Sequence, residues 1–327
     1  MRSNDAKILV LGATGFVGRN LVQRLLKDGF FVRVLTRKNT LKSHKNIEVI
    51  CGDLTSSAFK LDGLADSCQI IFNCAGQISD ASQMHSLHVD ATSRVINEVI
   101  RSSNRESSTK QWIQLSSVGA YGVLKLNCNS NTINENSQPK PEGVYEISKF
   151  LSDKLVIKAS SNSNFTYTIL RPSNIVGDQM TNRSFLGLLR AIKKRTFFYI
   201  GSKKSIATYI HVDDVVDALI ESLLNQNAKN QIFNISNDCF FEDIVTKVAR
   251  HNNDQHRYLC LPERPLRFIV KLLSKLIRVP LTQKRIDALV SQTTYPCTKI
   301  KSLLGLTPSR SIPTFSFEYL KSNNEKN

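Results

Sequence analysis

The chain has 327 residues, enough for a large core in one large domain or two closely associated ones. Its net charge is +17, but its 44 lysines and arginines are dispersed and no nucleic-acid motif accompanies them, so we expect no nucleic-acid partner. Seven cysteines without a CxxC pair predict neither a disulfide framework nor a metal site. No signal peptide and no membrane-spanning apolar run is found, and we expect a cytoplasmic protein.

The first half of the chain alternates short β-rich runs with helical periodicity. We expect strands over 8–11, 31–36, 47–51, 70–74, 112–116 and 167–171. Continuous apolar strands that alternate with helices are typical of a parallel sheet covered on both faces. The pattern therefore predicts an α/β fold with a doubly wound parallel sheet.

Three glycines follow the first expected strand, in the stretch GATGFVG over 12–18. Gly12 can form the tight turn, Gly15 lets the backbone approach a pyrophosphate, and Gly18 lets the helix pack close to the strand. The start of the following helix favours an anion. This context predicts a dinucleotide site and a Rossmann-type sheet. Its expected cofactor-binding residues are Gly12, Thr14, Gly15, Phe16, Val17 and Gly18.

The ends of the next strands bear on the choice of cofactor. No acidic residue follows the second strand, and Arg37 can pair with a 2′-phosphate, so NADP is favoured slightly over NAD. Asp53 can accept hydrogen bonds from an adenine amino group, with Leu54 beside it. Ala75, after the fourth strand, leaves room for the cofactor.

Polar segments and a change of pattern mark the rest of the chain. We expect a surface loop over 102–110 and a longer loop near the crevice over 127–141. The later pattern predicts a helix over 213–224, a strand over 232–235, a mostly helical region from about residue 239, and a polar, frayed tail over 321–327.

A candidate catalytic group follows the fifth strand. Tyr145 and Lys149, in YEISK, share one face of a helix if the segment is helical. The ammonium can lower the pKa of the phenol, which can then exchange a proton with a substrate oxygen while hydride moves to or from a nicotinamide. Ser117, at the same mouth of the sheet, can orient that oxygen. A surface i, i+4 pair and a strand-end cap are the alternative interpretations.

These motifs together resemble an extended short-chain dehydrogenase/reductase of the NAD-dependent epimerase/dehydratase family. The matching stretches are GATGFVG at 12–18, GDL at 52–54, LSSVGAYG at 115–122, YEISK at 145–149, LRPSNIVG at 170–177 and YIHVDDVVDAL at 209–219. The resemblance implies a Rossmann domain over 1–172 and 207–236. It also implies a smaller, mostly helical substrate region over 173–206 and 237–321, and a flexible tail over 322–327.

The same resemblance implies roles for single residues. Ser117, Tyr145 and Lys149 correspond to the catalytic triad, with Tyr145, Lys149 and Pro172 beside the nicotinamide. The residues expected to face the substrate are Ser117, Tyr121, Asn174 and Arg285. A solvated helix face is the alternative for Arg285. A homodimer through a four-helix interface that includes the Tyr145 helix is also implied.

Two departures from the family pattern narrow the range of expected substrates and reactions. Many UDP-sugar epimerases carry an arginine just before their YIH motif, but residues 205–208 read SIAT. Lys203 and Lys204 are nearby, although a lysine does not replace a bidentate arginine. Val118 and Gly119 stand where the family's 4,6-dehydratases place acidic residues, which argues against dehydration.

The resemblance implies hydride transfer at C4 of a nucleotide-linked hexose, in the synthesis of a surface polysaccharide. Epimerization with recycled NAD and reduction with NADPH use the same site chemistry, and both stay open. The alternatives are an NADPH-dependent reductase of a non-sugar carbonyl and a non-catalytic dinucleotide-binding scaffold.

A basic, apolar helix is expected over 265–280, with Arg267, Lys271, Lys275 and Arg278 on one face. One interpretation is weak peripheral contact with an anionic membrane. The other is a helix packed on the substrate region with its basic face in solvent.

Overall fold

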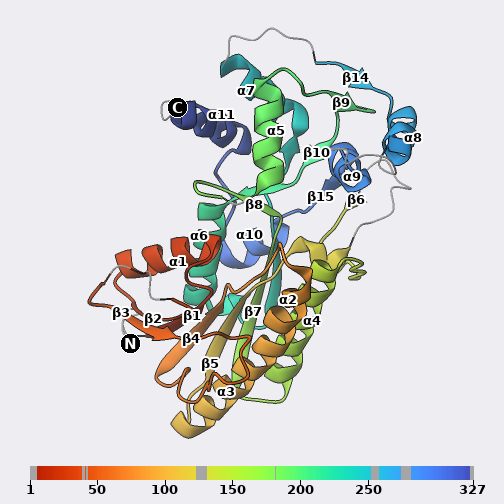
Figure 1. Ribbon diagram of the computed structural model, residues 1–327. Helices are drawn as coiled ribbons and strands as arrows, with labels where there is room; N and C mark the ends of the chain where they lie inside the picture. Colours follow the sequence, from red (N-terminus) through yellow and green to blue (C-terminus); the bar gives the residue numbers. More distant parts are fainter. Residues whose placement is uncertain are drawn as a thin grey trace.

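A computed structural model describes residues 6–38, 41, 43–122, 131–180, 182–251, 258–273 and 281–324 (Figure 1). Parts of the predicted 127–141 loop and of the predicted 265–280 helix lie outside these residues. Within the described part of the chain, no helix has the length and apolar character needed to cross a membrane.

A seven-stranded sheet forms the centre of the fold, in the order β12-β7-β5-β4-β1-β2-β3. Every neighbouring pair in it is parallel. The strands are β1 (Lys7–Leu11), β2 (Phe31–Thr36), β3 (Ile47–Cys51), β4 (Cys68–Asn73), β5 (Lys110–Leu115), β7 (Phe165–Pro172) and β12 (Gln231–Ile235). The order reverses between β1 and β4, and such a reversal opens the crevice in which doubly wound folds bind ligands. The predicted sheet is confirmed.

Helices cover both faces of this sheet because successive residues of a buried strand point to opposite sides. Ile8 and Val10 of β1 pack in one cluster with α1 (Phe16–Lys27) and α6 (Val212–Leu224). Leu9 and Leu11 pack in the other cluster with α3 (Ala91–Glu106) and with Val156 of α4 (Val144–Ser161). Figure 1 shows the two pairs of helices on opposite faces.

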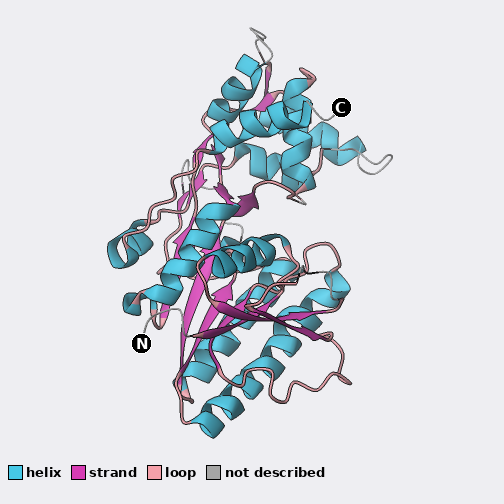
Figure 2. Cartoon of the chain, turned by 90° about the vertical axis from the view of Figure 1, so that its left-hand side faces the viewer, coloured by secondary structure: helices cyan, strands magenta, loops and turns pink. Residues whose placement is uncertain are grey.

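A second region of helices and short strand pairs stands at one end of the sheet (Figure 2). The chain enters it from β7 through β8 (Asn174–Val176), which pairs in parallel with β11 (Tyr209–His211). Its helices are α5 (Arg183–Lys193), α7 (Phe241–His251), α8 (Glu263–Leu273), α9 (Gln283–Val290) and α11 (Ile312–Asn324). Its other strands are β9 (Tyr199–Ile200), β10 (Ile206–Ala207), β13 (Cys239–Phe240), β14 (Cys260–Leu261) and β15 (Thr293–Thr294), the last paired with β6 (Asn131–Thr132). The mostly helical C-terminal region is therefore confirmed.

Three details differ from the sequence predictions. The surface loop predicted over 102–110 is wrong: α3 runs to Glu106, and Ser102 and Ser103 are buried. Their short polar side chains form local hydrogen bonds, Ser102 with Glu106 and Ser103 with the Ser108 carbonyl, so polarity did not indicate exposure. The predicted tail begins too early, because α11 continues to Asn324. α10 (Thr298–Leu304), predicted in the substrate region, packs on the sheet cluster.

Gly18 is the tightest point between α1 and the turn before it. A Cβ at Gly18 would lie 2.1 Å from the carbonyl oxygen of Gly12. We expect Gly18→Ala to lower the free energy of unfolding by about 1–3 kcal/mol, because the backbone must move apart. At Gly187 in α5, by contrast, an added Cβ would meet no neighbouring atom within 4 Å. Gly187→Ala should therefore leave stability unchanged or raised in urea unfolding, and an equal loss in both variants would contradict this packing.

Candidate active site

The turn between β1 and α1 forms a backbone cradle suited to an anion. Gly12 has a φ of +75°, and its Cβ would lie 2.6 Å from the amide nitrogen of Ala75. Gly15 is the N-cap residue of α1, so no side chain caps the helix, and its first turn carries no acidic residue. Its first N–H groups and the positive end of its dipole are thus directed toward an anionic ligand. The residues present fit the pyrophosphate of a dinucleotide.

Polar groups at the ends of β2 and β3 lie next to this cradle. Arg37 is exposed directly after β2. Asp53 Oδ1 accepts hydrogen bonds from the hydroxyl of Thr55 at 2.7 Å and from its N–H at 2.9 Å. These bonds lower the pKa of Asp53, and the charge of Arg37 lowers it further. The Leu54 carbonyl accepts a hydrogen bond from Arg94 at 3.0 Å. Arg37 and Asp53 therefore act on each other at the expected adenosine end.

Ser117 and Tyr145 meet at the carboxyl end of β5. Ser117 caps a short turn by accepting the N–H of Gly119 at 3.0 Å, so the capping interpretation holds. The Ser117 hydroxyl also lies close to the phenol of Tyr145, the second residue of α4. Burial raises the pKa of Tyr145 to about 12, and the nearby Ser117 hydroxyl opposes this rise.

Lys149 follows Tyr145 by one turn of α4 and is buried. Its Nζ donates to the carbonyl oxygen of Leu115 at 2.6 Å, which ties α4 to the end of β5. Burial lowers the pKa of Lys149, and the negative charge of Asp153 opposes that. The pKa of Tyr145, predicted from the sequence to fall beside this ammonium, rises instead because of burial, and the negative charges of Glu146 and Asp153 raise it further.

His88 belongs to this group, although the sequence motifs did not identify it. It lies in a π-helical turn, η2 (Ser86–Asp90), and such turns are frequent at functional sites. Its ring meets that of Tyr145 edge-on, with centroids 5.7 Å apart. Nε2 accepts the N–H of Gln77 at 2.9 Å, so the proton is on Nδ1, which donates to Ser148 Oγ at 2.8 Å. Ser148 in turn donates to the carbonyl of Tyr145.

A buried ion pair supports the same helix and was also missed. Asp153 Oδ2 accepts from Arg171 at 3.0 Å and from Ser116 Oγ at 2.8 Å. Among the described residues, no partner satisfies its second oxygen, Oδ1. Asp153 stands four residues after Lys149, so both charges face one side of α4. In the sequence, this pair could have been found from the i, i+4 spacing of Lys149 and Asp153 and from an arginine within an apolar strand.

The expected substrate-facing residues differ in their surroundings. Pro172 is buried at the end of β7. Asn174 is exposed, and its amide donates to the carbonyl of Thr208 at 3.2 Å. Arg285 is exposed on α9, whose first turn is capped by Thr282.

Tyr121 is enclosed by protein. Its hydroxyl donates to Asn234 Oδ1 at 2.9 Å, and the guanidinium of Arg171 lies 4.8 Å from its ring centroid. Tyr121 therefore supports the buried ion pair, and its contact with a substrate stays a prediction.

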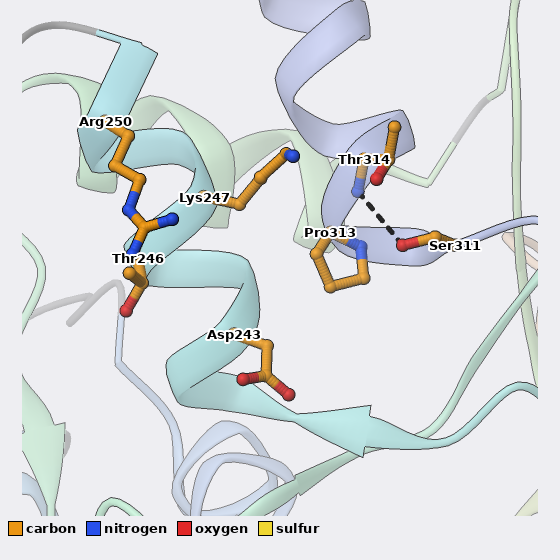
Figure 3. A pocket seen from close by; sticks show the side chains of 7 residues that line it. All are labelled: Asp243, Thr246, Lys247, Arg250, Ser311, Pro313 and Thr314. Atoms are coloured by element: carbon orange, nitrogen blue, oxygen red, sulfur yellow. Dashed lines mark hydrogen bonds between the residues drawn. The ribbon is translucent and has the colours of Figure 1, made fainter.

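A separate polar cavity of about 320 Å³ lies between α7 and the start of α11. Figure 3 shows Lys247 reaching toward the beginning of α11, where the Thr314 N–H donates to Ser311 Oγ. The cavity shares no lining residue with the Tyr145 group, so it is not part of the candidate active site.

The buried His88 makes stability depend on pH. Burial lowers its pKa from 6.5 to about 3. Between pH 6.5 and pH 3 the unfolded chain binds more protons at this histidine than the folded chain does. The free energy of unfolding therefore falls as the pH falls, by at most about 1.4 kcal/mol per pH unit. We expect His88→Gln to flatten this part of the profile in urea unfolding from pH 7 to pH 4. His85→Gln, at an exposed position, should leave it unchanged, and parallel profiles for wild type and His88→Gln would contradict the assignment.

The Asp153–Arg171 pair makes a second stability prediction. Asp153→Asn leaves the Arg171 charge buried without its counter-charge, so we expect a loss of about 3–5 kcal/mol in the free energy of unfolding. Glu242→Gln is the control, because its pair with Lys203 is about half exposed and should contribute less than about 1 kcal/mol. Equal, small losses would mean that the buried pair does not support the site.

Comparison with known proteins agrees with this geometry. The family model for the NAD dependent epimerase/dehydratase family matches residues 8–236. UDP-glucose 4-epimerase of Vibrio cholerae is 25% identical over 257 residues, which cover 76% of each chain. Sterol-4-alpha-carboxylate 3-dehydrogenase, decarboxylating, of Mus musculus is 24% identical over 94% of this chain and 88% of its own.

Solved structures show the same fold. UDP-glucuronic acid 4-epimerase from Bacillus cereus, solved in complex with NAD, superposes with a TM-score of 0.72 at 18% identity. The match covers 97% of this chain and 99% of that one. The family match, together with the glycine cradle and the Ser117–Tyr145–Lys149 group, leads to one assignment. The chain belongs to the NAD-dependent epimerase/dehydratase family and is an NAD-dependent enzyme of the extended short-chain dehydrogenase/reductase type.

Proposed function

We propose that this enzyme transfers hydride at C4 of a nucleotide-linked hexose, with Ser117, Tyr145 and Lys149 as its catalytic residues. The observation that carries the proposal is the grouping of these side chains: Ser117 lies close enough to Tyr145 to lower the pKa of its phenol, and Lys149 is anchored to the Leu115 carbonyl one turn later. All three lie at the carboxyl end of β5, which β4 separates from β1 and its Gly12 cradle. A hydroxyl and a phenol can hold one substrate oxygen there.

Each residue has a distinct role in this proposal. Ser117 donates to the reacting oxygen and orients it toward Tyr145. Tyr145 accepts the alcohol proton during oxidation at C4 and returns a proton to that oxygen during reduction. Lys149, one turn after Tyr145 on α4, supplies positive charge at this end of the crevice and can hold the nicotinamide ribose. The bound nicotinamide supplies the hydride acceptor or donor.

Two fates of the 4-keto sugar remain within the proposal. An epimerase returns hydride to the opposite face of the sugar, whereas a reductase consumes NADPH once in each turnover. The name of the Vibrio relative favours a UDP-hexose. The absence of an arginine at 205–208 weakens that choice, and Lys203 is engaged with Glu242 at 3.3 Å.

The second candidate function is reduction of a non-sugar carbonyl. The observation that favours it is the mouse relative, whose name gives a sterol carboxylate as substrate and which aligns over most of this chain. UDP-galactose, and then a 4-keto sugar nucleotide with NADPH, are the probes that separate the candidates.

The roles of the two regions of the chain, its assembly and its location follow from the same proposal. Residues 1–172 with 207–236 bind the cofactor, and residues 173–206 with 237–321 cover the substrate. We propose a homodimer, supported by the exposed Val144 and Ile147 on α4. The proposals that the enzyme is cytoplasmic and that it takes part in the synthesis of a surface polysaccharide rest on the family resemblance alone.

Tyr145→Phe tests the catalytic role. It removes the proton-exchanging hydroxyl, so we expect kcat to fall by about 100-fold or more while the Kd of NADH stays within about threefold. Tyr167→Phe, at a half-buried tyrosine of β7, should leave kcat unchanged. Full cellular function of Tyr145→Phe would contradict catalysis and favour the scaffold.

Arg37→Ala tests the coenzyme preference. If Arg37 pairs with a 2′-phosphate, this variant should bind NADPH about 10-fold more weakly and NADH unchanged, because one charge-assisted hydrogen bond is lost. Lys38→Ala is the neighbouring control. If the affinities for NADPH and NADH fell equally, or neither fell, Arg37 would not bind the 2′-phosphate.

A further inference from the structure

The outward side of α8 (Glu263–Leu273) is apolar rather than basic. Phe268, Leu272 and Ile269 are 70%, 54% and 50% exposed, and Leu273 lies beside them. Neither a solvated basic face nor a fully packed helix accounts for this arrangement. Large apolar side chains gathered on one exposed helix face indicate a surface that is covered by something else.

The inward side of α8 explains why the apolar side chains face out. Val270 is 4% exposed and packs with Ile200 and Ile286. Arg267 is also on the packed side, where it donates to Glu263 at 2.8 Å and to Asp287 of α9 at 2.7 Å. Its ion pairs fix the helix to α9, so the exposed face is held in one orientation. Figure 1 shows α8 at the outer edge of the helical region.

Basic residues border the apolar face. Arg264 and Lys271 are exposed on α8 itself. Gly201, after β9, lies close to the start of α8, since a Cβ there would be 3.4 Å from Glu263 Oε2, and Lys204 follows it three residues later and is exposed. The acidic residue of the α8 segment, Glu263, is paired with Arg267. The rim of the surface is therefore positive.

We propose that α8 is a docking surface for an anionic phospholipid bilayer. Phe268, Ile269 and Leu272 enter the boundary between headgroups and acyl chains, while Arg264 and Lys271 face the lipid phosphates. Helices that lie in a membrane interface combine such an apolar face with basic flanks. A second copy of this chain is the poorer occupant of this face, because it would bring the same basic rim, Arg264 and Lys271, against itself.

Vesicle sedimentation tests the proposal with the full-length protein. We expect binding to phosphatidylcholine vesicles that contain 30% phosphatidylglycerol to be at least about 10-fold stronger than to phosphatidylcholine alone, and weaker in 0.5 M NaCl. Phe268→Ser/Leu272→Ser should lose at least about 10-fold of the binding to anionic vesicles. Arg264→Gln/Lys271→Gln should lose the preference for the anionic lipid.

Leu224→Ser is the matched control, because Leu224 is an exposed leucine at the end of α6 and should not affect binding. Circular dichroism and NADH binding confirm that each variant is folded. Absence of wild-type binding to anionic vesicles would overturn the proposal. So would a wild-type dimer that Phe268→Ser/Leu272→Ser converts to a monomer, since the surface would then belong to a second copy.

Discussion

The close approach of Gly12 to Ala75 is the constraint on which the rest of the site depends. It brings the carboxyl ends of β1 and β4 together at the point where the strand order reverses. A side chain at Gly12 or at Gly18 would separate α1 from this turn and move the free N–H groups of its first turn. Because the other parallel strands are in register with these two, the same constraint sets where β5 presents Ser117.

Buried polar groups position the proposed catalytic side chains around that crevice. The bond from Lys149 to the Leu115 carbonyl fixes α4 against β5, and the pair of Asp153 with Arg171 balances charge beneath it. On the other side, His88 joins the loop after β4 to α4 through Ser148. Burying these groups costs desolvation energy, so their mutual hydrogen bonds are what keep the arrangement stable.

Local patterns predicted the fold well, because strand periodicity and the glycine spacing are encoded in short stretches, and YEISK pointed to the Tyr145–Lys149 pair that the proposed site uses. The predicted strands differ from the observed ones by at most two residues at each end. His88, Asp153 and Arg171 were missed because their partners are distant in sequence: Asp153 and Arg171 are 18 positions apart, and His88 and Ser148 are 60 apart. The raised pKa of Tyr145 and the outward apolar side of α8 depend on tertiary burial, which residue spacing does not give.

Identification of the cofactor tests the central claim most directly. The purified protein would be denatured, the released nucleotide identified by mass spectrometry, and the emptied protein titrated with NAD, NADH, NADP and NADPH. The account predicts one dinucleotide site per chain: retained NAD or NADH would indicate an epimerase, and an empty site that prefers NADPH would indicate a reductase. Failure of all four dinucleotides to bind would contradict the account.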